Sequence, residues 1–244
     1  MSNLTEVILP MSWEIFEQAA NRYEAWYATP HGQRADHAER ALLERLLASF
    51  PTAQSVLEVG CGTGHFTAWL AGKGLEVVGL ERAPAMLVQF HQRAPELPVI
   101  LGDAHQLPVR TGAVDVAVFV TAIEFLEEPE VALREAVRVA RQGIILLALN
   151  RWSLGGFSRR WGSQARRSLL GQARDYSLTS LRALVQKAAG ERLLEVHGTS
   201  TLFPDGLWWV HAPIPLGDVI GMAALLTAPA ARTASVRVLR RETG

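Results

Sequence analysis

The sequence has one cysteine, no excess charge of either sign and no apolar run long enough to cross a membrane. Cys61 alone cannot form an internal disulfide or a site of several thiolates, which argues against a bound metal and fits a reducing compartment, the cytoplasm. Lysine plus arginine and aspartate plus glutamate both number 24, so no overall field draws the chain to nucleic acid or to an anionic membrane. The most apolar stretch, residues 219–231, is short and bracketed by prolines, and the N-terminus lacks the basic start and apolar run of a secretory signal. We therefore expect a globular cytoplasmic protein without a membrane span.

Five short apolar runs alternate along the chain with segments of helical character. Two of them, VDVAVFV and GIILLAL, are apolar at nearly every position, as central parallel strands covered on both faces are. We therefore expect an α/β fold with a doubly wound, mostly parallel sheet and helices on both faces. The runs are Ser55–Val59, Leu75–Leu80, Pro98–Leu101, Val114–Val120 and Gly143–Leu149, and the helical segments between them are 65–74, 84–95 and 128–143.

The regions outside this alternation complete a single predicted domain of 244 residues. Residues 1–50 are expected to form a helical arm or lid, 51–150 the ligand-binding core, 151–176 a basic insert, and 177–244 a C-terminal helix with two last strands. A serine cap and a closing glycine mark that helix at 177–190. The strands are expected at 191–203 and 233–241, antiparallel to one another, which makes a seven-stranded sheet whose last strand is antiparallel.

The first apolar run leads directly into a glycine-rich turn, VLEVGCGTGHF at residues 56–66. In a doubly wound sheet such a turn lies where ligands bind. The dinucleotide fingerprint requires a glycine where this chain has His65, and the nearby carboxylate of Glu58 disfavours a pyrophosphate but favours a cation. Glu81, at the end of the second run, is spaced to accept hydrogen bonds from ribose hydroxyls. A ligand with a ribose, a positive charge and no phosphate is expected, which describes S-adenosylmethionine.

Five segments then match a known family in order: VLEVGCGTG, VVGLERAPAML, LGDAHQLPV, residues 114–150 and YSLTSLRALVQKAAG. With them the chain resembles the class I S-adenosylmethionine-dependent methyltransferases, in the type 11-like small-molecule group. The resemblance implies that the glycine turn faces the methionine part, Glu81 the ribose, and further residues the adenine or the cofactor generally. These implied cofactor residues are Glu58, Gly60, Cys61, Gly62, Thr63, Gly64, Glu81, Arg82, Met86, Asp103, Ala104 and Thr121.

The chain departs from this family after the fourth run, where many relatives carry histidine or aromatic pairs. Here the sequence is TAIEFLEEP, which places Glu124 and Phe125 at that point. It also lacks the Asn/Asp-Pro-Pro-Tyr/Phe signature of enzymes that methylate nucleic-acid amino groups, which argues against a nucleic-acid substrate.

Several of these residues also have a purely structural explanation. Glycines after a strand can be turn residues only, and Asp103 can be a helix cap. Cys61 is better explained as a small residue in a tight loop than as a nucleophile. Glu124 can be a solvated carboxylate at a helix end, or it can face the substrate.

One face of a predicted N-terminal helix is aromatic. Trp13, Phe16, Ala20, Tyr23 and Tyr27 recur at three- and four-residue steps. We interpret Trp13 and Phe16 as packing residues. The hypothesis for the rest is a lid over the cofactor, whose aromatic faces hold a sulfonium by cation–π attraction; it consists of Tyr23, Trp26, Tyr27 and His31.

Substrate choice is expected to lie in the two outlying regions and after the fourth run. A basic amphipathic helix is predicted after the fifth run, and its arginines either form a solvated surface or recognise an anionic substrate or partner. A Trp- and His-rich stretch follows near residue 208, where packing is the alternative explanation. The candidate substrate residues are Trp26, Phe125, Arg159, Arg160, Trp208, Trp209 and His211.

The predicted activity is methyl transfer to a small molecule, with the acceptor atom left open. Such a reaction needs an in-line nucleophile and exclusion of water, and a base only where a proton must leave. The candidate bases are His31, His105, Tyr27 and Glu124. Two other functions stay open: a catalytically silent cofactor-binding regulator acting through the basic segment, and, disfavoured, a nicotinamide-dependent oxidoreductase. A homo-oligomer also stays open.

Overall fold

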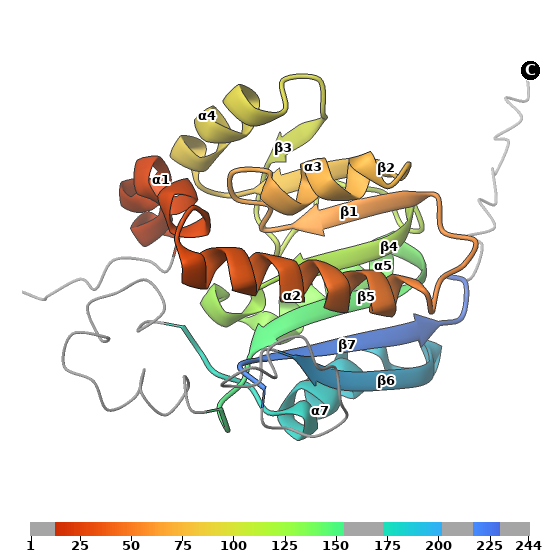
Figure 1. The fold of residues 1–244 in the computed structure, drawn as a ribbon. Coiled ribbons are helices and arrows are strands. Elements are labelled where there is room, and N and C mark those ends of the chain that lie inside the picture. The colour runs from red at the N-terminus through yellow and green to blue at the C-terminus, as the bar shows by residue number, and fades with distance from the viewer. Residues whose placement is uncertain (1–12, 154–172, 202–216, 230–244) are drawn as a thin grey trace, which may run out of the picture.

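The protein contains one seven-stranded sheet in the order β3-β2-β1-β4-β5-β7-β6 (Figure 1). It is seen in a computed structural model that describes residues 13–153, 173–201 and 217–229. The first five strands pair in parallel, and β7 is antiparallel to both β5 and β6. The strands are β1 (Ser55–Val59), β2 (Glu76–Glu81), β3 (Val99–Leu101), β4 (Val114–Val120), β5 (Ala140–Leu149), β6 (Leu193–Thr201) and β7 (Val219–Leu226). The expected doubly wound fold is confirmed.

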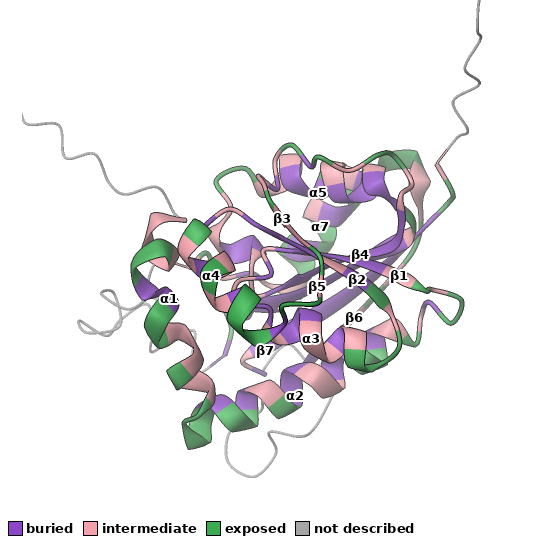
Figure 2. Ribbon diagram, turned by 90° about the horizontal axis from the view of Figure 1, so that it is seen from above, coloured by how far each residue is buried: buried purple, intermediate pink, exposed green. Residues whose placement is uncertain are grey.

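Helices cover both faces of this sheet (Figure 2). One face packs against α2 and α3, and the other packs against α5 and α7. The helix α1 lies beside α4 near the end of the sheet where the parallel strands finish (Figure 1). The helices are α1 (Glu14–Tyr27), α2 (Pro30–Leu47), α3 (His65–Gly72), α4 (Pro84–Arg93), α5 (Pro129–Val139) and α7 (Leu178–Ala189).

The central strands are buried on both sides. Every residue of β4 is buried, and alternate residues serve different layers: Val116 and Val118 pack toward α2 and α3, whereas Ala117 and Phe119 pack toward α5 and α7. This explains why the run VDVAVFV carries almost no polar residue. Its one polar side chain, Asp115, lies near the amino end of the strand, where it holds neighbouring loops.

Two predicted elements differ from the structure. The helix expected at 128–143 ends at Val139, because Ala140 already pairs with Val114 as the start of β5. The strand expected at 233–241 lies outside the described residues, and the last strand that the structure describes is Val219–Leu226. That run is apolar because it is buried between β5 and β6. Within the described part of the chain, no helix is long and apolar enough to cross a membrane.

Candidate functional site

The glycine turn after β1 depends on backbone conformations that glycine adopts without strain. Gly60, Gly62 and Gly64 have φ angles of 75°, 54° and 79°. The backbone N–H groups of Gly60 and Cys61 donate to the carbonyl of Leu80 at 2.7 and 3.0 Å, which fixes the turn against the end of β2. A Cβ at Gly60 would lie 2.7 Å from the Cβ of Ala122, so the turn also passes close to the chain that follows β4.

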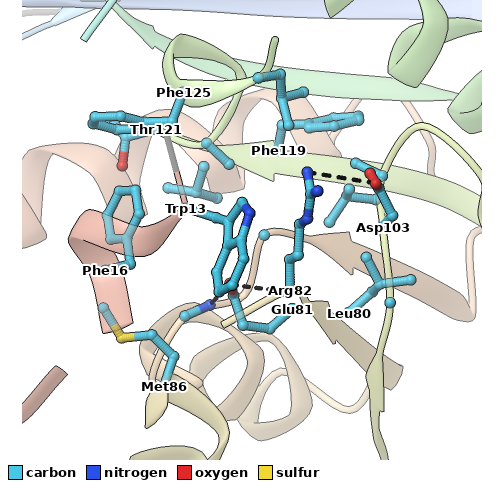
Figure 3. A pocket seen from close by; sticks show the side chains of 18 of the residues that line it. Trp13, Phe16, Leu80, Glu81, Arg82, Met86, Asp103, Phe119, Thr121 and Phe125 are labelled. Atoms are coloured by element: carbon cyan, nitrogen blue, oxygen red, sulfur yellow. Dashed lines mark hydrogen bonds and ion pairs between the residues drawn. The ribbon is translucent and has the colours of Figure 1, made fainter. Parts of the chain in front are cut away.

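A pocket opens beyond the carboxyl ends of β1, β2 and β4, where doubly wound sheets bind ligands (Figure 3). Its wall combines the glycine turn, the ends of three strands and one side of α1. The lining residues are Trp13, Phe16, Tyr23, Val59, Gly60, Gly62, Leu80, Glu81, Arg82, Met86, Gly102, Asp103, Ala104, His105, Phe119, Val120, Thr121, Ala122, Phe125, Leu126 and Glu127.

Glu81 is held rigidly at one wall of this pocket. Its carboxylate accepts hydrogen bonds from the backbone N–H groups of Gly62 at 2.9 Å and of Arg82 and Ala83 at 2.8 Å. Burial raises the pKa of Glu81, although these three donors act in the opposite direction. A carboxylate has about four acceptor positions, so a further donor such as a hydroxyl can still bind to it.

A network of charged side chains forms another part of the pocket wall. The Arg82 guanidinium lies 3.4 Å from the Asp103 carboxylate and 3.5 Å from that of Glu127. His105 donates to Asp103 from its backbone at 2.9 Å and places its ring Nδ1 2.6 Å from the same oxygen. Burial alone would raise the pKa of Asp103, but the hydrogen bonds from His105 and the charge of Arg82 lower it.

His105 lines the pocket, yet both of its ring nitrogens are engaged. The backbone N–H of Glu128 donates to Nε2 at 3.2 Å, so the ring proton is assigned to Nδ1, which faces Asp103. This geometry does not leave a ring nitrogen to take a proton from an acceptor. The structure therefore gives His105 the role of a loop support rather than of the candidate base.

Three residues of the glycine-turn segment point away from the pocket. Glu58 is buried and accepts a hydrogen bond from the hydroxyl of Thr67. Burial raises its pKa to about 8, so it is mostly protonated at neutral pH, contrary to the attracting charge that we expected. The Cys61 side chain packs with Phe90, and burial raises the pKa of its thiol, which agrees with the small-residue explanation. Thr63 donates to Glu24 of α1.

The aromatic face of α1 and the residue just before this helix contribute to the pocket. Trp13, Phe16 and Tyr23 line the pocket. Tyr27 stacks instead on His65, with ring centroids 3.9 Å apart and an interplanar angle of 11°. Trp26 packs edge-on against Tyr27 and His31, at 4.9 and 6.1 Å, outside the pocket lining. Of the four residues expected in the lid, Tyr23 lines the pocket, and Trp26, Tyr27 and His31 do not. Trp13 and Phe16, which were expected only to pack, line it as well.

The segment after β4 contributes Thr121 and Phe125 to the pocket. Thr121 has a φ of 46°, and Phe125 packs edge-on against Phe16 at 4.7 Å, which joins α1 to the sheet. Glu124 is buried rather than solvated; its Oε1 accepts a hydrogen bond from the backbone N–H of Leu149 at 2.6 Å, and it lies outside the pocket lining. Of the other predicted cofactor residues, Gly64 packs against Phe90, whereas Met86 and Ala104 line the pocket.

Several lining residues had not been predicted, and some candidates lie elsewhere. Glu127, Gly102 and the pocket roles of Trp13 and Phe16 were missed; the acidic run before Pro129 was the available signal for Glu127. Arg159, Arg160, Trp208, Trp209 and His211 lie outside the described residues. Within the described ranges, no group of three His, Cys, Asp or Glu side chains could hold a metal ion.

The pocket fits an adenosine-bearing sulfonium ligand. Gly60 and Gly62 have no side chain, so a ligand can approach their backbone closely. The Glu81 carboxylate lies at the wall of the same pocket. The indole N–H of Trp13 is shielded from water, and no acceptor in the described part of the chain reaches it. Fold and pocket together are those expected of a class I methyltransferase domain of the S-adenosylmethionine-dependent kind.

Comparisons with known proteins agree with this class. Residues 57–148 match the family model described as a methyltransferase domain. A structure described as an S-adenosylmethionine-dependent methyltransferase, "possible histamine N-methyltransferase" of Thermotoga maritima, is 27% identical with a TM-score of 0.72, over 88% of this chain and 99% of that one. These matches support a class I S-adenosylmethionine-dependent methyltransferase, and S-adenosylmethionine is the cofactor of this class.

Two further matches extend the comparison. Malonyl-[acyl-carrier protein] O-methyltransferase of Serratia marcescens is 32% identical over 134 residues, which are 54% of this chain and 49% of that protein. The chain thus spans about half the length of the curated relatives it matches. Magnesium protoporphyrin IX methyltransferase of Synechocystis, solved with bound S-adenosylmethionine, is 16% identical with a TM-score of 0.60 over 90% of this chain and 99% of that one, and shows the shared fold.

Proposed function

We propose that this protein transfers a methyl group from S-adenosylmethionine to a small-molecule acceptor in the cytoplasm. One observation carries the proposal: Gly60, Gly62 and Glu81 line one pocket at the carboxyl end of the parallel strands. The same pocket is lined by aromatic side chains from the α1 region and from the segment after β4. When bound, the cofactor supplies a methyl group activated by its sulfonium. The protein's task is to hold the acceptor in line with that methyl group and to exclude water.

The aromatic side chains of this pocket suit that task. Phe16 and Phe125 pack edge-on between α1 and the segment after β4, and Phe16 also contacts Tyr23 with ring centroids 6.5 Å apart. These contacts shield the pocket from water on the α1 side. Burial raises the pKa of Tyr23 above its usual range, so its phenol stays protonated and can act as a hydrogen-bonding group.

We further infer that the acceptor group is an amine rather than a carboxylate. Of the charged side chains that line the pocket, three carry carboxylates, Glu81, Asp103 and Glu127, and one carries a guanidinium, Arg82. A carboxylate acceptor would bring another negative charge into this poorly solvated region. An unprotonated amine attacks with its lone pair and loses its proton afterwards, so the reaction needs no base from Tyr27, His31 or Glu124. The arginines of the insert, Arg159 and Arg160, would then serve a partner protein or an anionic part of the acceptor.

The test begins with calorimetric titration of the protein with S-adenosylmethionine, S-adenosylhomocysteine and NAD. Binding of the first two, lost in Glu81→Gln but kept in the exposed control Glu44→Gln, supports the cofactor site. Binding of NAD alone would overturn it.

Methyl transfer is then followed with radiolabelled S-adenosylmethionine and two acceptors: histamine, an amine, and the malonyl thioester of acyl carrier protein, a carboxylate. Methylation of histamine alone supports the amine inference, and methylation of the malonyl thioester alone contradicts it. Cofactor binding without methylation of a broad acceptor panel would favour the catalytically silent regulator.

A further inference from the structure

Trp13, which immediately precedes α1, places its indole in the middle of the pocket (Figure 3). In that view Phe16 lies on one side of the indole and Arg82 on the other. The centre of the Arg82 guanidinium lies 5.5 Å from the centroid of the Trp13 ring, within the range of a cation–π contact. Sequence reasoning had interpreted Trp13 as a packing residue only.

The polar edge of this indole has no hydrogen-bond partner among the residues that the structure describes. Nε1 is shielded from solvent, and no acceptor among the described residues lies within hydrogen-bond distance of it. Buried N–H groups are almost always paired in native structures, because an unpaired one has lost its hydrogen bond to water without a replacement. Because Trp13 lines the pocket, its unpaired donor points to an acceptor atom that arrives with the ligand, once the side chains that shield Nε1 from solvent move to admit it.

The position of Trp13 is fixed by contacts of α1 with α4. The backbone N–H of Ala85 donates to the carboxylate of Glu17 at 3.0 Å, and the side-chain amide of Gln89 donates to that of Asn21 at 3.0 Å. Farther along α1, Glu24 pairs with Arg93. Three successive turns of α1 are thus tied to α4, so the indole is held at the pocket by the fold rather than by a single contact.

We propose that Trp13 is a cofactor-binding residue whose Nε1–H donates a hydrogen bond to the adenosine part of S-adenosylmethionine. The adenosine part is indicated because Arg82, whose guanidinium lies over the indole, follows Glu81 directly and pairs with Asp103. The acceptor atom is a ring nitrogen of the base or an oxygen of the ribose. This inference rests on the proposed function, since it assumes that the pocket binds this cofactor.

The experiment measures the affinity of the full-length protein for S-adenosylhomocysteine by calorimetry. Trp13→Phe keeps an aromatic ring and removes the N–H, whereas Trp13→Ala removes both. Trp152→Phe is the matched control, because Trp152 is 62% exposed and outside the pocket lining. The loss of one hydrogen bond should weaken binding about three- to tenfold in Trp13→Phe. Trp13→Ala should weaken it further, and Trp152→Phe should leave it unchanged.

A second readout separates a hydrogen bond from packing. In protein labelled with ¹⁵N-tryptophan, the indole signal that disappears in Trp13→Phe belongs to Trp13. Its proton resonance should move downfield when S-adenosylhomocysteine is added, because the N–H gains an acceptor. Circular dichroism and the unfolding midpoint verify that each variant is folded.

The outcomes distinguish this inference from the proposed function. If the unaltered protein does not bind S-adenosylhomocysteine, the proposed function itself fails. If it binds and Trp13→Phe binds equally well, with no shift of the indole signal, only the role of Trp13 is overturned. Tighter binding by Trp13→Ala would also overturn that role, since the indole would then compete with the cofactor for space.

Discussion

At the residue scale, Gly60 meets two independent constraints. Its φ of 75° disfavours any side chain, and an added Cβ would lie 2.7 Å from the Cβ of Ala122. Gly60→Ala should therefore lower the free energy of unfolding by about 2–4 kcal/mol. It should also abolish binding of S-adenosylhomocysteine, because the turn must shift to relieve the clash. Urea unfolding and calorimetry measure the two effects.

Gly74→Ala is the matched control for this substitution. Gly74 also has a positive φ, 86°, but no described atom lies within 4 Å of its virtual Cβ. Gly74→Ala should cost only about 1 kcal/mol and leave ligand binding intact. Equal losses in both variants would mean that conformational strain alone, and not the approach to Ala122, makes Gly60 necessary.

Glu39 on α2 provides a prediction about pH. Its side chain is buried, with the residue only 4% exposed, and no hydrogen-bond partner for it lies in the described part of the chain. Burial first, and then the charges of Asp36 and Glu124, raise its pKa to about 8 from 4.5. Between those two values the unfolded chain has lost this proton and the folded protein keeps it, so stability falls as the pH rises.

Glu39→Gln should remove this dependence. The variant should be more stable than the unaltered protein by on the order of 2 kcal/mol at pH 9 and nearly equal to it at pH 5. Urea unfolding across this pH range measures the difference. Glu44→Gln, at an exposed position of the same helix, should leave the pH profile unchanged. A parallel shift of Glu39→Gln at all pH values would contradict the assignment.

At the scale of the element, α1 is tied to the glycine turn by one carboxylate. Glu24 accepts from the hydroxyl of Thr63 and pairs with Arg93, and His65 Nδ1 lies 3.8 Å away. Glu24→Ala should loosen α1 without unfolding α2, whose Leu42 and Leu43 are fully buried. Faster amide hydrogen exchange in residues 14–27 and weaker S-adenosylhomocysteine binding are expected. Unchanged exchange in α1 would show that Glu17 and Asn21 suffice to hold it.

The same helix shows what sequence periodicity can and cannot predict. A three- and four-residue repeat identifies the buried face of α1, but it carries no information on which turns of that face reach the pocket. Trp13 and Phe16 reach it, whereas Tyr27 faces His65. That placement depends on contacts with α4 and with the glycine turn, which are distant in the sequence.

The strands give a complementary lesson. The cores of β1 to β5 and the glycine turn were predictable, because period-two patterning and turn residues are local signals. The direction of Glu58 could also have been found: Leu57 and Val59 share one face of β1, so Glu58 points to the opposite face, toward Thr67 of α3. The sequence alone could not identify β7 as a strand, because its burial comes from pairing with both β5 and β6.

At the scale of the whole molecule, the two ends of the sheet have separate tasks. The carboxyl ends of the parallel strands build the pocket. At the amino ends, the Asp115 carboxylate accepts from the backbone N–H groups of Gln54 at 2.9 Å and Ser55 at 3.0 Å, and from the Arg141 side chain at 2.9 Å. Although burial acts in the opposite direction, these donors hold the pKa of Asp115 well below its usual range.

Asp115→Asn tests this separation, because an amide keeps the shape of the side chain but offers only one accepting atom. The variant should lose about 2–4 kcal/mol of unfolding free energy at pH 7 and keep its affinity for S-adenosylhomocysteine. The difference from the unaltered protein should shrink as the pH falls below the usual aspartate value, since the unfolded chain then takes up a proton that the folded protein refuses. Urea unfolding at pH 7 and pH 3 with parallel calorimetry measures both effects. A loss of affinity as large as that in Gly60→Ala would mean that the two ends of the sheet are coupled through β1 and β4.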